Sequence, residues 1–248
     1  MKKKIKRIAL ITGGAKRIGM SIARHLHNCD IDIMIHHNQS SNEANELKGQ
    51  LNNLRANSAA SIQANLLESD SYAYIIKEVI SVFGQLDFLI NNASTYYPTP
   101  IESINETSWE DLIGTNLKAP LMLSKHASKF IKETKGAIIN LTDAQIQNPK
   151  KNYIIYALAK SGLATLTKSL AKELGPDVRV NAIAPGAILW PESNEEFTES
   201  YREKVISQTL LKRTGSPEDI SKAVEFLLLH SPYITGQTLS IDGGRQYS

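Results

Sequence analysis

The sequence has few of the residues that cross-link a chain, hold it in a membrane or bind a structural metal. Its 248 residues include one cysteine, Cys29, which excludes an internal disulfide and a cysteine-rich metal site. The six histidines show no metal-ligand spacing, so no metal is expected. No apolar run approaches the roughly 18 residues of a membrane span. The apolar run after the N-terminal lysines ends in Thr12-Gly13-Gly14, unlike a signal peptide, so a cytoplasmic location is predicted.

The chain is also poor in net charge, which is only +3 at neutral pH. The clearest contributor to that charge is the segment MKKKIKR at residues 1–7. A nucleic-acid-binding arm or a membrane anchor is one interpretation of this segment, and a solvated run before the first strand is the simpler one. We therefore expect neither a nucleic-acid partner nor a membrane partner.

Short apolar segments alternate with longer amphipathic ones along the whole chain. The apolar segments predict strands within 5–12, 31–36, 58–66, 86–93, 136–142, 178–186 and 237–244. Helical spacing predicts helices over 18–28, 40–57, 70–84, 106–132 and 156–174, with two more helical segments before the last strand. Strands that alternate with helices are typical of an α/β fold with a parallel sheet covered on both faces. No linker or repeat interrupts the pattern, so residues 1–248 are predicted to form a single domain.

Local signals predict where several of these helices begin and end. Ser40 with Glu43 three residues later is a capping-box pattern for the second helix. Gly84 is expected to close the third helix, and the Gly-Pro pair at 175–176 to stop the helix before the sixth strand. Pro120 lies inside the long helical region and is expected to bend it.

The turn after the first strand, TGGAKRIG at 12–19, has features of a dinucleotide site. Gly13 and Gly19 would let the backbone approach a pyrophosphate, and the N-terminus of the next helix supplies N–H donors. Glycines alone are weak evidence for a dinucleotide site, because many strand-to-helix turns contain them. The position of this turn directly after the first strand is what favours the dinucleotide interpretation. No acidic residue stands at the end of the second strand before Glu43, which favours NADP over NAD. Lys16 and Arg17 are cations that could meet a 2′-phosphate, or they are simply exposed loop charges.

A second pattern combines a tyrosine, a lysine and an aspartate. Tyr156 and Lys160 are four residues apart, so they lie on the same side of a helix. A neighbouring ammonium lowers a tyrosine pKa, which would make Tyr156 a usable proton donor. Asp143 precedes Tyr156 by thirteen residues, and burial would raise its pKa while Lys160 opposes that shift.

With TGGAKRIG, NNAS at 91–94, Asn116, the Tyr156/Lys160 pair and NAIAPG at 181–186 in this order, the chain resembles the short-chain dehydrogenase/reductase family. The resemblance implies a Rossmann-type, doubly wound sheet of about seven strands, NADP(H) as cofactor and a homotetramer or dimer. It implies that Asn116 holds a proton-relay water and that Lys160 also holds the nicotinamide ribose. The cofactor contacts it implies are Gly13, Arg17, Ile18, Gly19, His36, Ser40, Asn65, Leu66, Asn92, Ala93, Ser94, Tyr156, Lys160, Pro185 and Gly186.

Asp143 stands where most members of that family have a catalytic serine, and pteridine reductases are the branch that carries Asp there. TGGAKRIG is similar to their TGAAKRLG, and NNASTYYPTP at 91–100 is similar to their NNASSFYPTP. By this resemblance Ser94 contacts the pterin and Tyr96 stacks on it. The loop at 187–197 closes over the substrate, and Trp190 in that loop forms one wall of the substrate site. HHNQSSNEAN at 36–45 departs from their HYHRSAAEAN at Gln39, where an arginine usually meets the 2′-phosphate, so a softened NADP preference is expected.

The resemblance therefore implies an NADPH-dependent pteridine reductase in which Asn116, Asp143, Tyr156 and Lys160 are catalytic. Hydride would add to C6 of a dihydropterin and a proton to N5, and a carboxylic acid suits a proton that is bound for nitrogen. The residues do not choose between biopterin, monapterin and dihydrofolate as the substrate. An NADPH-dependent carbonyl reductase, such as a 3-oxoacyl carrier-protein reductase, would share the fold but would normally have serine at 143. A non-catalytic NADP sensor would have lost the catalytic group.

Overall fold

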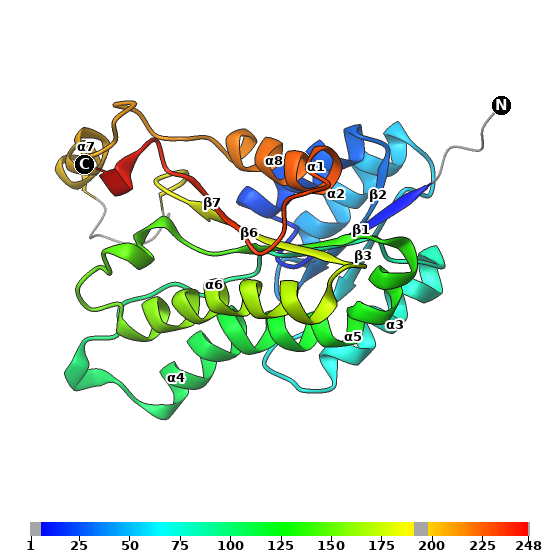
Figure 1. Cartoon of the computed structure of the whole chain (residues 1–248), viewed down its shortest axis with the longest axis horizontal. Helices are drawn as coiled ribbons and strands as arrows, with labels where there is room; N and C mark the ends of the chain where they lie inside the picture. Colours follow the sequence, from blue (N-terminus) through cyan, green and yellow to red (C-terminus); the bar gives the residue numbers. More distant parts are fainter. Residues whose placement is uncertain (1–5, 191–197, 248) are drawn as a thin grey trace.

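The computed structural model describes residues 6–190 and 198–247, which fold around one seven-stranded sheet (Figure 1). All six strand pairings are parallel, and the strand order is β3-β2-β1-β4-β5-β6-β7. The strands are β1 (Arg7–Ile11), β2 (Ile31–His37), β3 (Ala59–Gln63), β4 (Phe88–Asn91), β5 (Ala137–Leu141), β6 (Arg179–Pro185) and β7 (Thr238–Ile241). The predicted doubly wound α/β architecture is confirmed.

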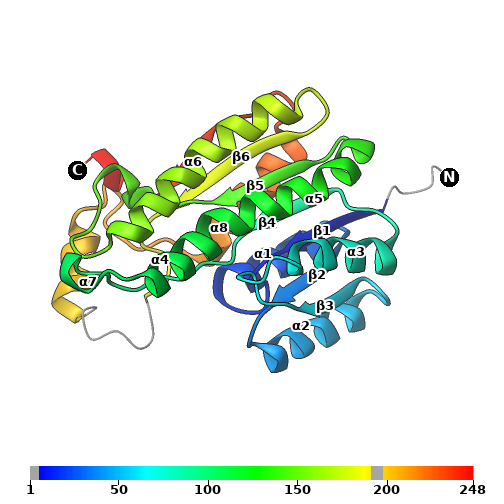
Figure 2. The same ribbon diagram turned by 90° about the horizontal axis from the view of Figure 1, so that it is seen from below.

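Helices cover both faces of the sheet, as Figures 1 and 2 show from two sides. One face carries α1 (Arg17–Asn28), α2 (Ser41–Leu54) and α8 (Pro217–Glu225). The other carries α3 (Ser71–Phe83), α5 (Ala119–Thr134) and α6 (Ile154–Leu174), with α4 (Glu106–Ile113) beside α6. The helix α7 (Glu199–Ser207) lies beyond the carboxyl ends of the strands. Within residues 6–190 and 198–247, no helix combines the length and apolar character needed to cross a membrane.

The strand order reverses direction at β1, because the chain moves outward to β2 and β3 and then returns to place β4 on the other side of β1. The loops that leave β1 and β4 therefore separate at their carboxyl ends and open a crevice. Ligands of open α/β sheets bind at such a switch point. The fold alone predicts a site at this edge of the sheet.

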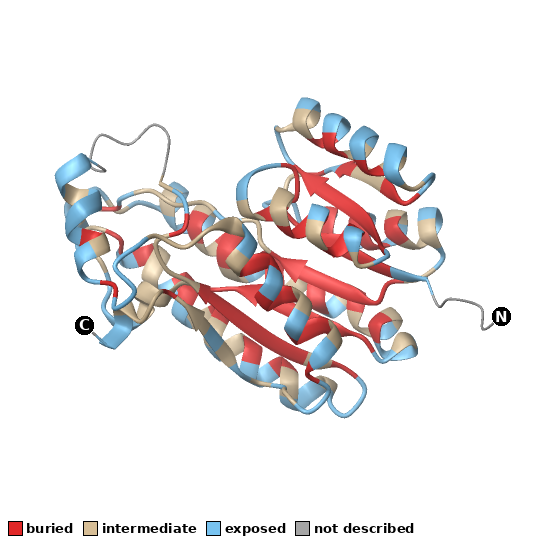
Figure 3. Cartoon of the chain, turned by 90° about the horizontal axis from the view of Figure 1, so that it is seen from above, coloured by how far each residue is buried: buried red, intermediate tan, exposed pale blue. Residues whose placement is uncertain are grey.

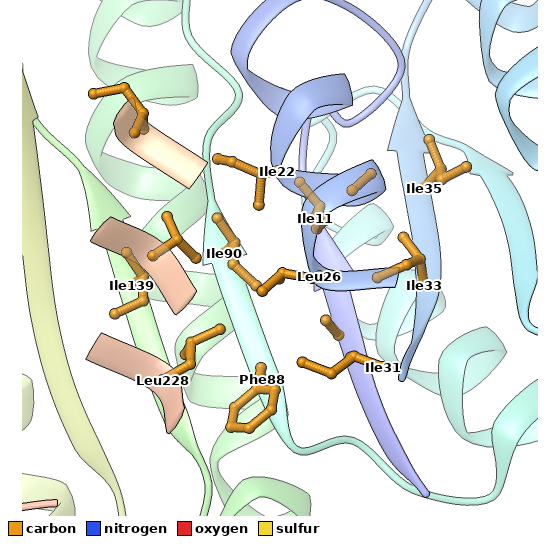
Figure 4. Packing of buried hydrophobic residues seen from close by; sticks show 14 of the residues in the cluster. Ile11, Ile22, Leu26, Ile31, Ile33, Ile35, Phe88, Ile90, Ile139 and Leu228 are labelled. Carbon is orange, nitrogen blue, oxygen red and sulfur yellow. The ribbon is translucent and has the colours of Figure 1, made fainter. Parts of the chain in front are cut away.

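The apolar core lies on both faces of the buried strands, which are red in Figure 3. Figure 4 shows the face under α1, where Ile22 and Leu26 project toward β4. Ile90 of β4 and Ile139 of β5 belong to the same cluster, and Leu228 extends it from the π-helical turn η4 (Phe226–His230). These strands are buried on both faces, which explains why they read as continuous apolar runs instead of alternating ones.

The structure confirms two of the predicted helix ends and corrects two other details. Gly84 ends α3 with a φ of 80°, and the α6 helix ends just before the Gly-Pro pair at 175–176. The predicted capping box at Ser40 is wrong: Ser40 makes no side-chain cap bond, and Glu43 pairs with a lysine elsewhere. The long helical region predicted as one helix is instead two α-helices, α4 and α5, joined without interruption by the π-helical turn η2 (Gly114–Lys118) just before Pro120, whose missing N–H removes one bond of a regular α-helix.

The packing under α1 leads to a stability prediction. Leu26→Ala should lower the free energy of unfolding by about 2–5 kcal/mol, because the side chain is fully buried and its removal leaves a cavity. Leu54→Ala is the matched control, since Leu54 at the end of α2 is 73% exposed and its loss should change stability by about 0.5 kcal/mol at most. Urea denaturation followed by circular dichroism measures both, and equal effects would contradict this account of the core.

Candidate active site

A cleft of about 470 Å³ opens at the carboxyl edge of the sheet. It brings together eleven of the residues that the sequence predicted for the site, which come from five separate segments of the chain. They are Arg17, Ile18, Asn92, Ser94, Tyr96, Asp143, Tyr156, Lys160, Pro185, Gly186 and Trp190. The other predicted residues are not among the described residues that line the cleft: Gly13, Gly19, His36, Ser40, Asn65, Leu66, Ala93 and Asn116.

The turn after β1 is so compact that two of its positions need glycine. Gly13 has a φ of +59°, and a Cβ on Gly19 would lie 2.2 Å from the Gly13 carbonyl oxygen. The Asn92 side-chain amide fastens the turn by donating to the carbonyls of Thr12 (2.9 Å) and Gly13 (3.1 Å). Since α1 starts without a side-chain cap, its first backbone N–H groups remain available to a ligand. The turn therefore fits the pyrophosphate of a dinucleotide.

His36, at the end of β2, supports this turn from below. The Gly13 N–H donates to His36 Nδ1 (3.3 Å), so the ring proton lies on Nε2, which donates to the Ala64 carbonyl (3.1 Å). Burial lowers the pKa of His36 to about 4. The ring is therefore neutral near pH 7 and positions the glycine turn, and it offers no charge to a phosphate.

The two cations of the turn point to different places. Lys16 Nζ lies 2.7 Å from a carboxylate oxygen of Glu43, in the first turn of α2. Arg17 Nη2 donates to the carbonyls of Leu189 (3.4 Å) and Trp190 (3.2 Å). Lys16 is thus the cation near the end of β2, where a 2′-phosphate would lie, and Arg17 reaches the loop that follows β6.

Two predicted adenine-side residues lie in the loop after β3. Leu66 is buried, and its carbonyl accepts a hydrogen bond from the Tyr72 hydroxyl (2.7 Å). Asn65 is half-buried, and its side chain accepts a hydrogen bond from the Leu67 N–H (3.1 Å).

Ala93, in the loop after β4, packs against Gly13, and its N–H donates to the Thr12 hydroxyl.

Asp143 and Tyr156 are in direct contact at the centre of the cleft. The Tyr156 hydroxyl donates to Asp143 Oδ2 at 2.8 Å, while the Gln145 N–H donates to Oδ1 at 2.7 Å. Burial raises the pKa of Asp143, and the nearby Lys160 ammonium partly opposes that shift. Because Oδ1 is held by a backbone N–H, Oδ2 is the oxygen that can carry a proton toward Tyr156.

Lys160 is buried one turn farther along α6, and its ammonium donates to the Leu141 carbonyl (2.8 Å). Burial lowers its pKa to about 8, and the charge of Asp143 acts in the opposite direction. The sequence predicted that this ammonium would lower the tyrosine pKa. That prediction is wrong, because burial and the Asp143 carboxylate hold the pKa of Tyr156 well above its ordinary value.

Asn116 joins the hydrogen-bonded pair of Asp143 and Tyr156 through an intermediate side chain. It lies in the π-helical turn η2, fully buried, and its amide donates to the Leu112 carbonyl (2.9 Å) and the Thr95 carbonyl (3.0 Å). The Ser94 hydroxyl donates to Asn116 Oδ1 (2.6 Å), and a hydrogen bond also joins the Ser94 and Tyr156 side chains. Asn116 therefore connects to Tyr156 through Ser94, a link that the separate motifs gave no means of foreseeing.

Tyr96 presents its ring to the cleft against an aromatic support. Its ring stacks on Tyr153 with centroids 4.6 Å apart and meets Tyr156 edge-on at 4.8 Å. A bridge between Thr99 and Tyr153 ties the loop after β4 to the start of α6. One face of the Tyr96 ring is thus covered by Tyr153, and the ring is held beside Tyr156.

Trp190 lies at the cleft as predicted, with its ring 6.4 Å from that of Tyr201 in α7. The rest of the predicted closing loop, 191–197, lies outside the described residues. Sequence reasoning missed several lining residues, including Gln145, Tyr201 and Arg245. Gln145 lies two residues after Asp143, and that closeness could have made it a candidate. Nothing in the sequence placed Tyr201 or Arg245 near this edge of the sheet.

Comparison with known proteins identifies the family. The family described as enoyl-(acyl carrier protein) reductase matches residues 13–246. The chain is 33% identical to pteridine reductase 1 of Leishmania tarentolae over 279 aligned positions, which cover 96% of this chain and 95% of the relative.

Other relatives carry a different name at similar distance. A 3-oxoacyl-(acyl-carrier-protein) reductase of Staphylococcus aureus is 35% identical, with 97% of this chain and 98% of the relative covered. One from Synechocystis is 32% identical, with 96% of both chains covered. Together with the glycine turn, the switch-point cleft and the Asn116, Tyr156 and Lys160 side chains gathered at it, these matches assign the chain to the short-chain dehydrogenase/reductase family, whose members are NAD(P)-dependent oxidoreductases.

Proposed function

We propose that the protein is an NADPH-dependent pteridine reductase, which reduces a dihydropterin to a tetrahydropterin. The observation that carries this proposal is the 2.8 Å hydrogen bond between the Tyr156 hydroxyl and Asp143 Oδ2. Both a carbonyl oxygen and a ring nitrogen take up a proton when hydride adds to the neighbouring carbon, but a serine beside the tyrosine can only hydrogen-bond to the reacting group. A buried carboxyl group in contact with the tyrosine can supply that proton.

The proton moves along the contacts already present. With Asp143 protonated at Oδ2, Tyr156 passes its hydroxyl proton to the substrate nitrogen and takes the Asp143 proton in its place. The carboxylate that remains keeps its bond from the Gln145 N–H and faces the Lys160 charge, and both stabilise it. The raised pKa of Asp143 keeps the acid form available at higher pH than for an ordinary aspartate.

The remaining walls of the cleft suit a flat heterocycle and a phosphorylated cofactor. Tyr96 offers an aromatic face that a pterin ring could cover, and aromatic stacking contributes about 0.5–1.5 kcal/mol beyond the area buried. When bound, NADPH would supply the hydride at the nicotinamide end. Lys16, beside the uncapped start of α2, favours a 2′-phosphate at the adenosine end. The homotetramer implied by the family resemblance and the single domain over 1–248 stay predictions.

A 3-oxoacyl carrier-protein reductase is the second candidate, and the similarity to the Staphylococcus aureus relative favours it. The two candidates share the fold and the Tyr156/Lys160 pair, so the substrate alone separates them. NADPH oxidation should be measured with dihydrobiopterin, dihydrofolate and acetoacetyl thioester side by side. Faster turnover of the thioester than of either pterin substrate would replace our proposal with this one.

Asp143 should be essential for proton delivery to nitrogen. Asp143→Asn and Asp143→Ser should bind NADPH normally and lose pterin turnover by roughly 10²-fold or more, the usual scale for general acid catalysis. Stopped-flow or steady-state NADPH oxidation measures the loss, with Tyr156→Phe as the impaired reference. Unchanged turnover in Asp143→Asn across the pH range would show that the carboxyl group does not donate the proton.

The pH profile gives an independent check on the coupling between Asp143 and Lys160. The rate should fall as pH rises in two steps, first as Asp143 loses its proton and then through the Lys160 pKa, which is about 8. Asp143→Asn should abolish the first fall and, since the Asp143 charge raises the Lys160 pKa, move the Lys160 limb to lower pH. A limb that stays in place would mean that Lys160 does not govern it.

Tyr96 should contribute to substrate affinity by stacking. Tyr96→Phe should keep most of the affinity for a dihydropterin, and Tyr96→Ala should lose on the order of 1 kcal/mol or more. Tyr97→Ala is the matched control, because Tyr97 hydrogen-bonds Asp111 and is not among the residues that line the cleft. Fluorescence titration compares the three, and equal losses in the two alanine variants would remove the stacking assignment.

The cofactor preference can be assigned to one cation. Lys16→Ala should weaken NADPH binding by roughly tenfold or more and leave NADH binding almost unchanged, because a charge-assisted contact contributes about 1.5–3 kcal/mol. Arg17→Ala should affect both cofactors alike, since Arg17 reaches across the cleft to the loop after β6. Calorimetric titration distinguishes them, and a loss selective for NADPH in Arg17→Ala alone would move the 2′-phosphate contact to Arg17.

A further inference from the structure

A group of nitrogen, sulfur and oxygen ligands lies at the far end of α1 from the cleft. Helix α1 begins at the cofactor turn with Arg17 and ends at Asn28, so its last turn lies about 18 Å from its first residue. That last turn contains His25 and is followed by Cys29. It packs against the end of α8, where Glu225 stands, on the face of the sheet shown uppermost in Figure 1.

The ligand atoms of these three residues are close to one another. His25 Nε2, Cys29 Sγ and a Glu225 carboxylate oxygen all lie within 4.8 Å of each other. His25 Nε2 is 2.7 Å from Glu225 Oε2, and His230 Nε2 of the turn η4 is 3.2 Å from Oε1. From this geometry we propose that His25, Cys29 and Glu225 form a zinc-binding site, with His230 as a positioning residue that orients the Glu225 carboxylate.

The ligand set and its framework fit zinc. Imidazole nitrogen, thiolate and carboxylate are the ligands that Zn²⁺ takes, at about 2.0–2.3 Å, with a water completing four-coordination. His25 and Cys29 are four residues apart, so both face the same side at the end of one helix. The side chains of His25 and Glu225 are 26% and 27% exposed, which leaves an entry path and room for the water. Rotations of these side chains can bring the three atoms to a common ion.

The site without a metal would be a salt bridge between Glu225 and two histidines. That arrangement also holds the Cys29 thiol, which hydrogen-bonds the same Glu225 carboxylate. A divalent cation would replace these contacts, because it attracts the thiolate and the carboxylate at once.

Binding must release protons, which gives the site a signature. The ion binds the Cys29 thiolate and the Nε2 lone pair of His25, so the thiol proton and any proton on Nε2 pass to the solvent. Zinc affinity should therefore rise with pH. The bound ion would link the C-terminal end of α1 to α8. It would thereby stabilise the position of the helix whose other end follows the cofactor turn.

The test uses the full-length protein and zinc itself. Titration of Zn²⁺ against a competing chelator should give one ion per chain, and Cys29→Ser or His25→Gln should weaken binding by about 10²-fold or more. His230→Gln should weaken it by about 10–100-fold, as expected for a residue that orients a ligand. The matched control is His126→Gln, a histidine of α5 on the opposite face of the sheet, which should bind zinc like the wild type.

Two measurements on the unmodified chain remain valid if a variant folds poorly. Since Cys29 is the only cysteine, iodoacetamide labels a single thiol, and zinc should slow that labelling by roughly tenfold or more until EDTA is added. Co²⁺ in place of Zn²⁺ should produce a thiolate charge-transfer band in the near ultraviolet. Labelling that zinc does not slow, or a Co²⁺ complex without this band, would overturn the proposal and leave a salt bridge only.

Discussion

Strand β1 is hydrogen-bonded in parallel to β2 on one side and to β4 on the other. Because all seven strands are parallel, the loops that carry functional side chains leave the sheet at the same edge. The turn after β1, the loop after β4, Asp143 after β5 and the Pro185-Gly186 turn after β6 meet there. The connections that leave β1 and β4 run to opposite sides and so open the crevice into which these segments project. The position of the cleft therefore follows from the strand order and not from any single residue.

Within that cleft the chemistry depends on three titratable groups that share one buried volume. Burial favours the neutral form of each, so it raises the pKa of Asp143 and Tyr156 and lowers that of Lys160. Their mutual contacts then decide which group gives up or keeps a proton. Asp143 accepts a hydrogen bond from the Tyr156 hydroxyl, and the nearby Lys160 charge lowers the pKa of Asp143 against the effect of burial. Under the proposed function, the raised pKa of Asp143 makes its acid form more available to substrate than that of an ordinary aspartate.

The relatives divide between two activities although their overall similarity to this chain is nearly equal. Such a division is expected, because a shared scaffold supports several reactions and the site residues choose among them. Under the proposed function, the distinguishing features here are the Asp143 carboxyl group bonded to Tyr156 and the Tyr96 ring stacked on Tyr153. The proposed zinc site lies on the same scaffold at the other end of α1, where it would affect the rigidity of the helix and not the reacting atoms.

The sequence by itself determined the order of strands and helices, because apolar runs and helical spacing are local signals. It also determined that Tyr156 and Lys160 share a helix face and that the Gly13 turn opens a helix. Tertiary structure decided everything that depends on a distant partner. Glu43 pairs with Lys16 instead of capping α2, His36 braces a turn 23 residues away, and Ser94 links Asn116 to the tyrosine. The sequence likewise did not predict the cluster of His25 and Cys29, because their carboxylate partner Glu225 lies 200 residues away from His25. Hydrogen bonds and burial depend on proximity in space, and only the packed sheet and helices bring such partners together.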